Sequence, residues 1–540
     1  MAFRTNKQTK TLPHLIINAG PGTGKTSTMI AGLSILSGGR PEWEGTEEQQ
    51  AIWDAMKGHY SSIGFQAFNK SIAGEIQERV PKNVKASTFH SFGLKVLRDN
   101  GYKLKVSGDN VRYQVKNIQG YKPKDRQEAK DFKAGLTITK IIGLLKNHLM
   151  SPTAENIGLI MDEFNIEMPA KTEMVTVVSI AVQVFQKSMS IEPGQQAYID
   201  FDDMLWLPLV LELDFGSSKF DLLINDESQD MNNIQHELVL RSGSRLICVG
   251  DRRQSIYGFR GADSRSMDTL KETLEKTERG VIELNLQTSF RLPKSGVANV
   301  NLFAPDLVAA DDAIEGSIDE TTTNLMTPKP GDLILSRINA NIFATAFRLL
   351  REKIGVRIQG RDFGKQLKKL LESICKGCVG VAEIQIKLRE YAEEEHGRLM
   401  QRTFPKRGIE ELNEKMSCLY SLTTGCKSVA EMSETIDELF SEDLPREKVV
   451  LLSTIHRAKG MEADTVWFLE PQLVPHKMAK TDAEIRQELN LQFVAETRHR
   501  KRLVYVYPSS KEEKDYRDAS EGRLAERDDQ YEAVIAQESH

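Results

Sequence analysis

The chain has 540 residues, a formal net charge of −5 at pH 7 and a hydrophobic fraction of 40%. This length exceeds what one hydrophobic core supports, so we expect several domains. The small negative charge excludes a polycation, and any nucleic-acid binding must therefore come from a local basic surface. Because no apolar run approaches the roughly 20 residues that span a membrane, and the N-terminal apolar stretch is too short for a signal peptide, we expect a cytoplasmic protein, nuclear if eukaryotic.

The first recognisable element is a strand followed by a glycine-rich loop and a helix. Residues 12–18 (LPHLIIN) predict a buried strand, and residues 27–36 predict a helix. Between them lies AGPGTGKT at 19–26, whose glycines let backbone N–H groups point at phosphates. In this pattern Lys25 reaches the β- and γ-phosphates of a nucleotide, and the Thr26 hydroxyl binds Mg²⁺.

The next segment, residues 96–199, is expected to be mixed and mainly helical, for example over 137–149. Its first part is basic, with Lys103, Lys105, Arg112, Lys116, Lys122, Lys124 and Arg126. Two interpretations stay open for this charge run: contact with duplex or single-stranded DNA, or a solvated face.

Two carboxylates then follow a buried strand. The apolar run at 221–225 ends in Asp226 and Glu227, at the edge where ligands bind in open α/β sheets. Asp226 is suited to the Mg²⁺ shell, and Glu227 to polarising the attacking water as a general base.

The segment VGDRRQSIYGFRGA at 249–262 follows a further predicted strand, 245–249. The Gln254 amide can sense a phosphate oxygen, while two aromatics and an arginine can stack on bases, namely Tyr257, Phe259 and Arg260. The alternative is a buried strand followed by a loop with two core aromatics.

The second half repeats the alternation of strands and helices, so we expect an α/β fold with parallel sheets. Residues 331–339 and 448–453 predict strands. The region between them is expected to be helical and holds Cys375, Cys378, Cys418 and Cys426. These are interpreted either as part of a zinc site or as buried thiols. The charged tail, 509–540, predicts a solvated helix or disorder.

Taken in order, these segments resemble the motifs of superfamily 1 DNA helicases of the UvrD/Rep/PcrA family. The matching segments are AGPGTGKT (19–26, motif I), AFNKSIAGEI (67–76, Ia), STFHSFG (87–93, Ib), DFDDML (200–205, Ic), NDESQD (225–230, II), VGDRRQSIYGFRGA (249–262, III), TSFR (288–291, IV), STIHRAKGMEAD (453–464, V) and FVAETRHRKRL (493–503, VI). Ala19 stands where the family usually has its first glycine.

The resemblance implies two RecA-like parallel-sheet P-loop domains, each with a mainly helical insertion, that use ATP and Mg²⁺. The expected domains are 1–95 with 200–285 (1A), the insertion 96–199 (1B), 286–374 with 445–508 (2A), and a reduced 2B insertion, 375–444. In the reduced insertion the chain is similar to phage-encoded members and to the F-box DNA helicase core.

The resemblance also assigns the nucleotide site. Catalytic roles fall on Glu227, Gln254, Arg291 and Arg498, and Mg²⁺ binding on Thr26 and Asp226. The two arginines are expected to stabilise charge on the transferred phosphoryl group. Nucleotide contacts are expected from Ala19, Gly20, Pro21, Gly22, Thr23, Gly24, Lys25, Thr26, Ser27, Phe290 and Glu462.

Single-stranded DNA contacts are implied for Phe68, Asn69, Lys70, Thr88, His90, Tyr257, Phe259, Arg260, Thr454 and His456. Phe259 replaces the usual Trp of motif III, and Phe290 the usual adenine-stacking Tyr of motif IV. Ser27 stands where the family often has Arg, and Gln8 is the candidate for the glutamine that reads adenine.

We therefore expect a monomeric ATP-dependent helicase that moves 3′→5′ on single-stranded DNA and unwinds duplex at single-strand/duplex junctions. DNA repair, replication or recombination would be its setting, with proteins of those processes as partners. The alternatives are a translocase that strips proteins from single strands with little unwinding, and an RNA-acting helicase.

Overall fold

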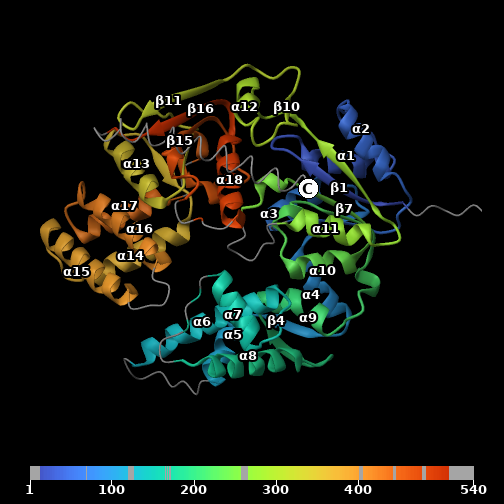
Figure 1. The fold of residues 1–540 in the computed structure, drawn as a ribbon, viewed down its shortest axis with the longest axis horizontal. Coiled ribbons are helices and arrows are strands. Elements are labelled where there is room, and N and C mark those ends of the chain that lie inside the picture. The colour runs from blue at the N-terminus through green and yellow to red at the C-terminus, as the bar shows by residue number, and fades with distance from the viewer. Residues whose placement is uncertain are drawn as a thin grey trace, which may run out of the picture. The chain divides into compact units, whose positions relative to one another are not determined.

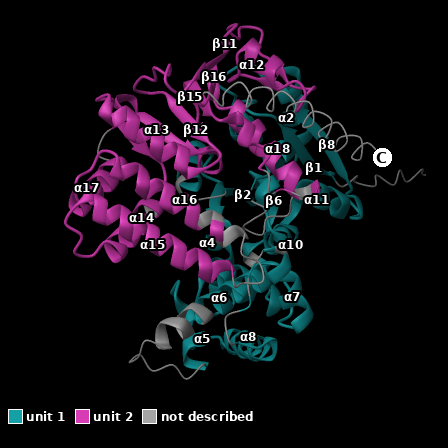
Figure 2. Ribbon diagram, turned by 60° about the vertical axis from the view of Figure 1, so that its left-hand side comes forward, with its two compact units in different colours: residues 1–287 teal, residues 288–540 magenta. Residues whose placement is uncertain are grey.

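The computed structural model describes residues 12–67, 70–118, 127–164, 166, 168, 172–256, 265–400, 406–441, 445–476, 479 and 482–509. The chain divides into two units, residues 1–287 and 288–540 (Figure 2). Each unit holds a six-stranded sheet whose paired strands all run parallel, with helices packed on it. The expected α/β class with two parallel-sheet domains is confirmed.

The sheet of the first unit has the strand order β3-β2-β6-β7-β1-β8. Its strands are β1 His14–Ala19, β2 Ile63–Ala67, β3 Val84–Thr88, β6 Phe220–Asn225, β7 Gly243–Gly250 and β8 Val281–Leu286. Successive residues of a strand point to opposite faces. Leu15 and Ile17 therefore lie in one apolar cluster with α1 Lys25–Leu36, α2 Glu47–Met56 and α3 Lys70–Arg79, while Ile16 lies in another.

That second cluster continues into the predicted 1B insertion, whose helices gather beside α4 and α9 (Figure 1). The elements are α4 Phe89–Asp99, β4 Lys103–Val106, α5 Asn110–Ile118, α6 Gln127–Asn147, α7 Ala154–Glu163, α8 Met174–Met189, β5 Gln196–Ile199 and α9 Phe201–Val210, with α10 Asn233–Ser242 and α11 Ser266–Glu275 further along the chain. Strands β4 and β5 pair in parallel. The chain therefore enters the helices α5 to α8 after β4 and comes back from them beside β4, at β5.

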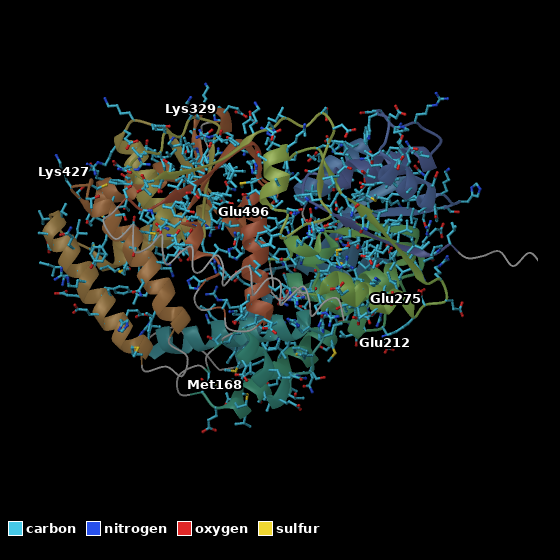
Figure 3. All side chains as sticks on the ribbon, turned by 45° about the horizontal axis from the view of Figure 1, so that its top comes forward. Met168, Glu212, Glu275, Lys329, Lys427 and Glu496 are labelled. Atoms are coloured by element: carbon cyan, nitrogen blue, oxygen red, sulfur yellow. The ribbon has the colours of Figure 1, made fainter. Side chains whose placement is uncertain are left out.

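The second unit has the strand order β11-β16-β15-β12-β14-β13 and a separate pair, β9 Thr288–Ser289 with β10 Val308–Ala309. The six strands are β11 Ser317–Thr322, β12 Leu333–Ser336, β13 Val356–Ile358, β14 Val450–Thr454, β15 Ala463–Leu469 and β16 His499–Tyr507, and the helices beside them are α12 Lys294–Asn299, α13 Asn339–Arg351 and α18 Asp482–Glu496. Figure 3 shows Glu496 on the last turn of α18, just before the chain reaches motif VI residue Arg498.

The predicted strand 331–339 is too long, because only Leu333–Ser336 is extended. Gly331 has a left-handed φ of 94°, and the Asp332 N–H donates to Lys329 O at 3.0 Å, so a turn precedes the strand. Asn339 already begins helix α13. Similarly, the predicted strand 448–453 starts two residues later than expected, after a 3-10 turn at Arg446–Lys448.

A helical lobe lies between β13 and β14. It comprises α14 Arg361–Ile374, α15 Val381–Met400, α16 Lys406–Thr423 and α17 Val429–Leu439, and these helices share a core with the sheet. Because α14 begins at Arg361, the helical lobe starts before residue 375, the first residue of the predicted 2B insertion. The assignment of this lobe to 2B stays a prediction. None of the helices in the described part of the chain has the length and apolarity to cross a membrane.

Candidate active site

The glycine-rich loop joins the end of β1 to the start of α1. Gly22 and Gly24 have φ values of 73° and 75°, in the left-handed region that glycine adopts without strain. The Thr23 hydroxyl donates to Gly20 O at 2.9 Å and tightens the loop. Within the described residues no side chain caps the start of α1 and no acidic residue lies in its first turn. The loop therefore presents backbone N–H groups and a helix N-terminus suited to a phosphate.

Thr26 and Asp226 meet although they lie far apart in the chain. The Thr26 hydroxyl, in the first turn of α1, donates to Asp226 Oδ2 at 2.8 Å, just beyond the end of β6. Two hard oxygen donors side by side, next to a phosphate loop, fit the ligands that Mg²⁺ prefers. These residues would hold the metal, which would supply charge neutralisation at the phosphates.

Burial of Asp226 affects the protonation of its side chain. Asp226 is 5% exposed, and burial raises its pKa to about 6, with the Glu227 carboxylate adding to the rise. Lys25 and the hydrogen bond from Thr26 act in the opposite direction. A bound divalent cation would stabilise the ionised form further, so the electrostatics fit a metal ligand.

Glu227 has a φ of 55°, unusual for a residue with a side chain. It begins the 3-10 turn Ser228–Asp230, and the Gln229 side-chain amide donates to its Oε2 at 2.5 Å. Strained backbone of this kind persists only where the surroundings hold it, and it clusters at functional sites.

The turn after β7 places motif III against motif II. Gln254 is 4% exposed, and its side-chain amide donates to Asp251 Oδ2 at 2.7 Å. The Asp251 backbone N–H donates in turn to Gln229 Oε1 at 3.2 Å. Residue types alone did not single out Gln229 and Asp251 as functional. The available signal was their position, just past the ends of two buried strands that the sheet places side by side.

The second unit brings a predicted catalytic residue, Arg291, together with a predicted nucleotide contact, Glu462. Arg291 Nε lies 2.5 Å from Glu462 Oε2, and Phe290 is 55% exposed, as a base-stacking ring requires. Arg498 is instead buried, and its guanidinium donates to Val494 O at 2.8 Å and to the Thr497 hydroxyl at 2.9 Å. The roles of these residues toward ATP stay predictions.

The predicted DNA contacts within the described residues differ in accessibility. Lys70 is exposed at the start of α3. Thr88 caps α4 by accepting from the Ser91 N–H at 3.2 Å, and the His90 ring lies edge-on to Phe201 at 6.2 Å. Burial lowers the pKa of His90, and Asp202 opposes this effect. Thr454 is buried and His456 half-buried; outside the described residues lie Phe68, Asn69, Tyr257, Phe259, Arg260 and Gln8.

The clustered cysteines lie in the helical lobe. Cys375, Cys418 and Cys426 are buried in its apolar core, and burial raises the pKa of all three thiols. Zinc requires thiolates, which such surroundings disfavour. In the part of the chain that the structure describes, no group of three or more His, Cys, Asp or Glu side chains gathers to hold a metal ion.

A phosphate loop, a Thr–Asp oxygen pair and a neighbouring glutamate on a parallel sheet define a P-loop nucleotide hydrolase. The UvrD/REP helicase N-terminal domain family matches residues 4–275, and the UvrD-like helicase C-terminal domain family matches residues 333–510. The chain belongs to the UvrD/Rep helicase family, and the resemblance inferred from the sequence is confirmed.

Individual relatives are distant. The ATP-dependent DNA helicase PcrA of Bacillus subtilis is 25% identical over 58% of this chain and 39% of its own length. The PcrA of Staphylococcus aureus is 25% identical over 51% and 36%, and a probable DNA helicase II homolog of Mycoplasma pneumoniae is 27% identical over 47% and 35%. The matched part of the chain thus spans less than two-fifths of these relatives. An arterivirus nonstructural protein 10 helicase overlaps 93% of this chain and 61% of its own at 9% identity and a TM-score of 0.32, too slight a likeness to bear on function.

Proposed function

We propose that this protein is an ATP-dependent DNA helicase that couples Mg²⁺-dependent ATP hydrolysis to 3′→5′ movement on single-stranded DNA. The observation that carries the proposal is the Thr26–Asp226 pair at 2.8 Å beside Glu227. It supplies the oxygen ligands and the general base that ATP hydrolysis needs. Membership of the UvrD/Rep family supports DNA as the track. The direction of movement is proposed from the resemblance of the motifs.

In this proposal each part of ATP binding and hydrolysis is carried out by particular residues of the chain. The loop 19–27 binds the phosphates through backbone N–H groups and Lys25, and Thr26 with Asp226 holds Mg²⁺. Glu227 accepts a proton from the attacking water. Charge on the γ-phosphate is stabilised by Arg291 and Arg498 and sensed by Gln254, while Phe290 and Glu462 contact the nucleotide.

The proposed DNA track includes Lys70, Thr88, His90, Thr454 and His456, together with the motif Ia and III residues outside the described part of the chain. We extend it to the basic start of the insertion. There Lys105 Nζ lies 5.9 Å from the ring centre of Tyr198, and three aromatics are more than half exposed: Tyr113, Tyr198 and Phe201. Exposed rings among cations suit single strands, because stacking works on any base. Phe201 also contacts His90 of motif Ib, so the two surfaces are continuous.

We further propose that the protein works as a monomer at single-strand/duplex junctions in repair, replication or recombination. The predicted reduced 2B insertion lies within the stretch between β13, which ends at Ile358, and β14, which begins at Val450, so it is short in sequence. This feature favours a second candidate function, removal of proteins from single strands with little unwinding.

A phosphate-release assay with single-stranded DNA, duplex DNA and RNA as stimulants tests the activity and the choice of track. We expect single-stranded DNA to stimulate most, and Lys25→Ala to abolish hydrolysis. Lys57→Ala, a change at an exposed lysine of the same unit, is the matched control. Stronger stimulation by RNA would refute DNA as the track, and no hydrolysis under any condition would refute the enzyme.

Duplexes with a single-stranded 3′ or 5′ tail test direction and unwinding. The proposal predicts displacement from the 3′ tail and is refuted by displacement from the 5′ tail alone. Removal of a bound protein from a 3′-tailed strand without displacement of a long duplex would instead support the second candidate function.

A further inference from the structure

Gln229 joins the two motifs on which hydrolysis depends. Its side-chain N–H donates to Glu227 Oε2 at 2.5 Å, and its side-chain carbonyl accepts from the Asp251 backbone N–H at 3.2 Å. An amide has one donating and one accepting end, so these two partners together determine which way it faces. Gln229 therefore contacts both the carboxylate of the proposed general base and the backbone of motif III.

The position of Gln229 is closely confined. Its side chain is buried, with 1% of the residue exposed, and its backbone carbonyl accepts from the Ser255 hydroxyl at 3.1 Å. A Cβ at Gly250 would lie 2.4 Å from Gln229 Oε1. Only glycine fits at the end of β7, because the Gln229 side chain packs directly against Gly250. The Gln229 side chain therefore has little room for another conformation.

Gln229 also connects the Glu227 carboxylate to the motif III residues Asp251 and Gln254. Asp251, whose N–H bonds Gln229, uses its carboxylate to accept from the Gln254 side-chain amide at 2.7 Å and from the Arg253 N–H at 3.1 Å. A chain of hydrogen bonds therefore runs from Glu227 through Gln229 and Asp251 to Gln254.

We propose that Gln229 is a positioning residue that holds the Glu227 carboxylate in the orientation needed to take a proton from water, and that it ties this orientation to motif III. The inference rests on the proposed ATP hydrolysis. A general base contributes only when it lies within hydrogen-bond reach of the proton it takes. Because Gln229 donates to the Glu227 carboxylate, it acts on the hydrolytic step through Glu227, while the phosphate loop binds ATP.

Gln229→Glu tests this role with minimal change of shape. One carboxylate oxygen still accepts from the Asp251 N–H, but the amide donor to Glu227 is replaced by a second carboxylate. Two carboxylates this close do not both ionise, so this variant adds like-charge repulsion to the loss of the donor. We expect single-strand-stimulated kcat to fall by about 10- to 100-fold, because small displacements of reacting groups cost rates of this order. KM for ATP and the Kd for a non-hydrolysable ATP analogue should stay within about 2-fold, since a general base contributes to the reaction rather than to ground-state binding.

Gln183→Glu on the exposed surface of α8 is the matched control, because it makes the same amide-to-carboxylate change away from the site. Gln229→Met removes the same donor without adding a charge, so the same kcat-against-KM comparison on it separates lost orientation from like-charge repulsion, and it decides if Gln229→Glu melts well below the wild type. A kcat within about 3-fold of wild type, or a parallel loss of nucleotide affinity, would overturn the proposal. Absence of hydrolysis in the wild type would instead refute the function itself.

Discussion

A buried ion pair joins the helical insertion to the sheet-bearing part of the first unit, and its loss should be costly. Lys146 on α6 places Nζ 2.6 Å from Asp203 Oδ1 on α9, with the side chains 0% and 1% exposed. The ammonium also lies 5.2 Å from the centre of the Trp206 ring. Asp200 and Asp202 lie close by, and both feel the charge of Lys146. Lys146→Met would leave these carboxyls without their buried cation.

The magnitude follows from the burial. Removing one partner of a buried ion pair costs about 3–5 kcal/mol, because the remaining charge is left without compensation. A loss of that size should lower the melting temperature of the unit by on the order of 10 °C. Burial raises the pKa of Asp200 to about 7, and Asp203 and Asp202 add to the rise while Lys146 opposes it. Without Lys146, Asp200 and Asp202 would bind protons more readily still. The destabilisation should therefore be largest near pH 8 and shrink as pH falls toward 5, where the folded state can protonate them.

Thermal melting of the full chain at pH 5 and pH 8 measures both effects. Lys146→Met combined with Asp203→Asn removes both charges and should recover part of the loss, because Asn can still accept from the Asp200 N–H that Asp203 bonds. Lys57→Met removes one partner of an exposed pair and should change stability by less than about 1 kcal/mol. The reasoning is refuted if Lys146→Met costs no more than Lys57→Met at pH 8, or if the double variant melts no higher than the single one.

Three further changes probe the nucleotide site and its support. Arg245→Met should destabilise the first unit by about 2–4 kcal/mol in urea unfolding, because it removes the guanidinium that donates to the buried or partly buried carbonyls of Pro13, Ala55 and Met56. His14 accepts from the Leu246 N–H through Nδ1 at 3.0 Å, and burial, Arg279 and Arg245 lower its pKa to about 4. Its contribution to stability is thus present above pH 6.5 and lost as pH falls toward 4, by up to about 3 kcal/mol; His14→Gln should flatten the melting temperature between those values. Phe290→Ala should raise KM for ATP about 2- to 10-fold and Phe290→Tyr should not; equal KM values would remove the stacking role.

Much of the first unit's site could be predicted because its signals are local. The loop 19–26 combines a strand end, glycines and Lys-Thr within eight residues, and Asp226 directly follows an apolar run. Both patterns reflect short-range requirements, namely left-handed backbone at glycine and a polar side chain at the edge of a buried strand. The strand at 331–339 was predicted too long for the opposite reason, since apolar composition does not mark where a turn or a helix cap begins.

Contacts between distant segments could not be read in the same way. Gln229 is one polar residue among several in DESQD, and nothing local shows that its amide meets the Asp251 N–H across the sheet edge. Lys146 is likewise an ordinary lysine in a helical pattern, and only the packing of α6 on α9 makes it a buried cation. Whether the four clustered cysteines are buried thiols or metal ligands also depends on packing, which places three of them in an apolar core.

The sequence by itself determined the parallel α/β class, the phosphate loop, the carboxylate pair and the helicase family, because each rests on local spacing and residue type. The tertiary structure alone decided which oxygens meet across 200 residues, as in Thr26 and Asp226, and which side chain donates to the Glu227 carboxylate. The physical reason is that neighbouring strands β6 and β7 bring motifs II and III together, and hydrogen bonds across that edge depend on register rather than on sequence distance.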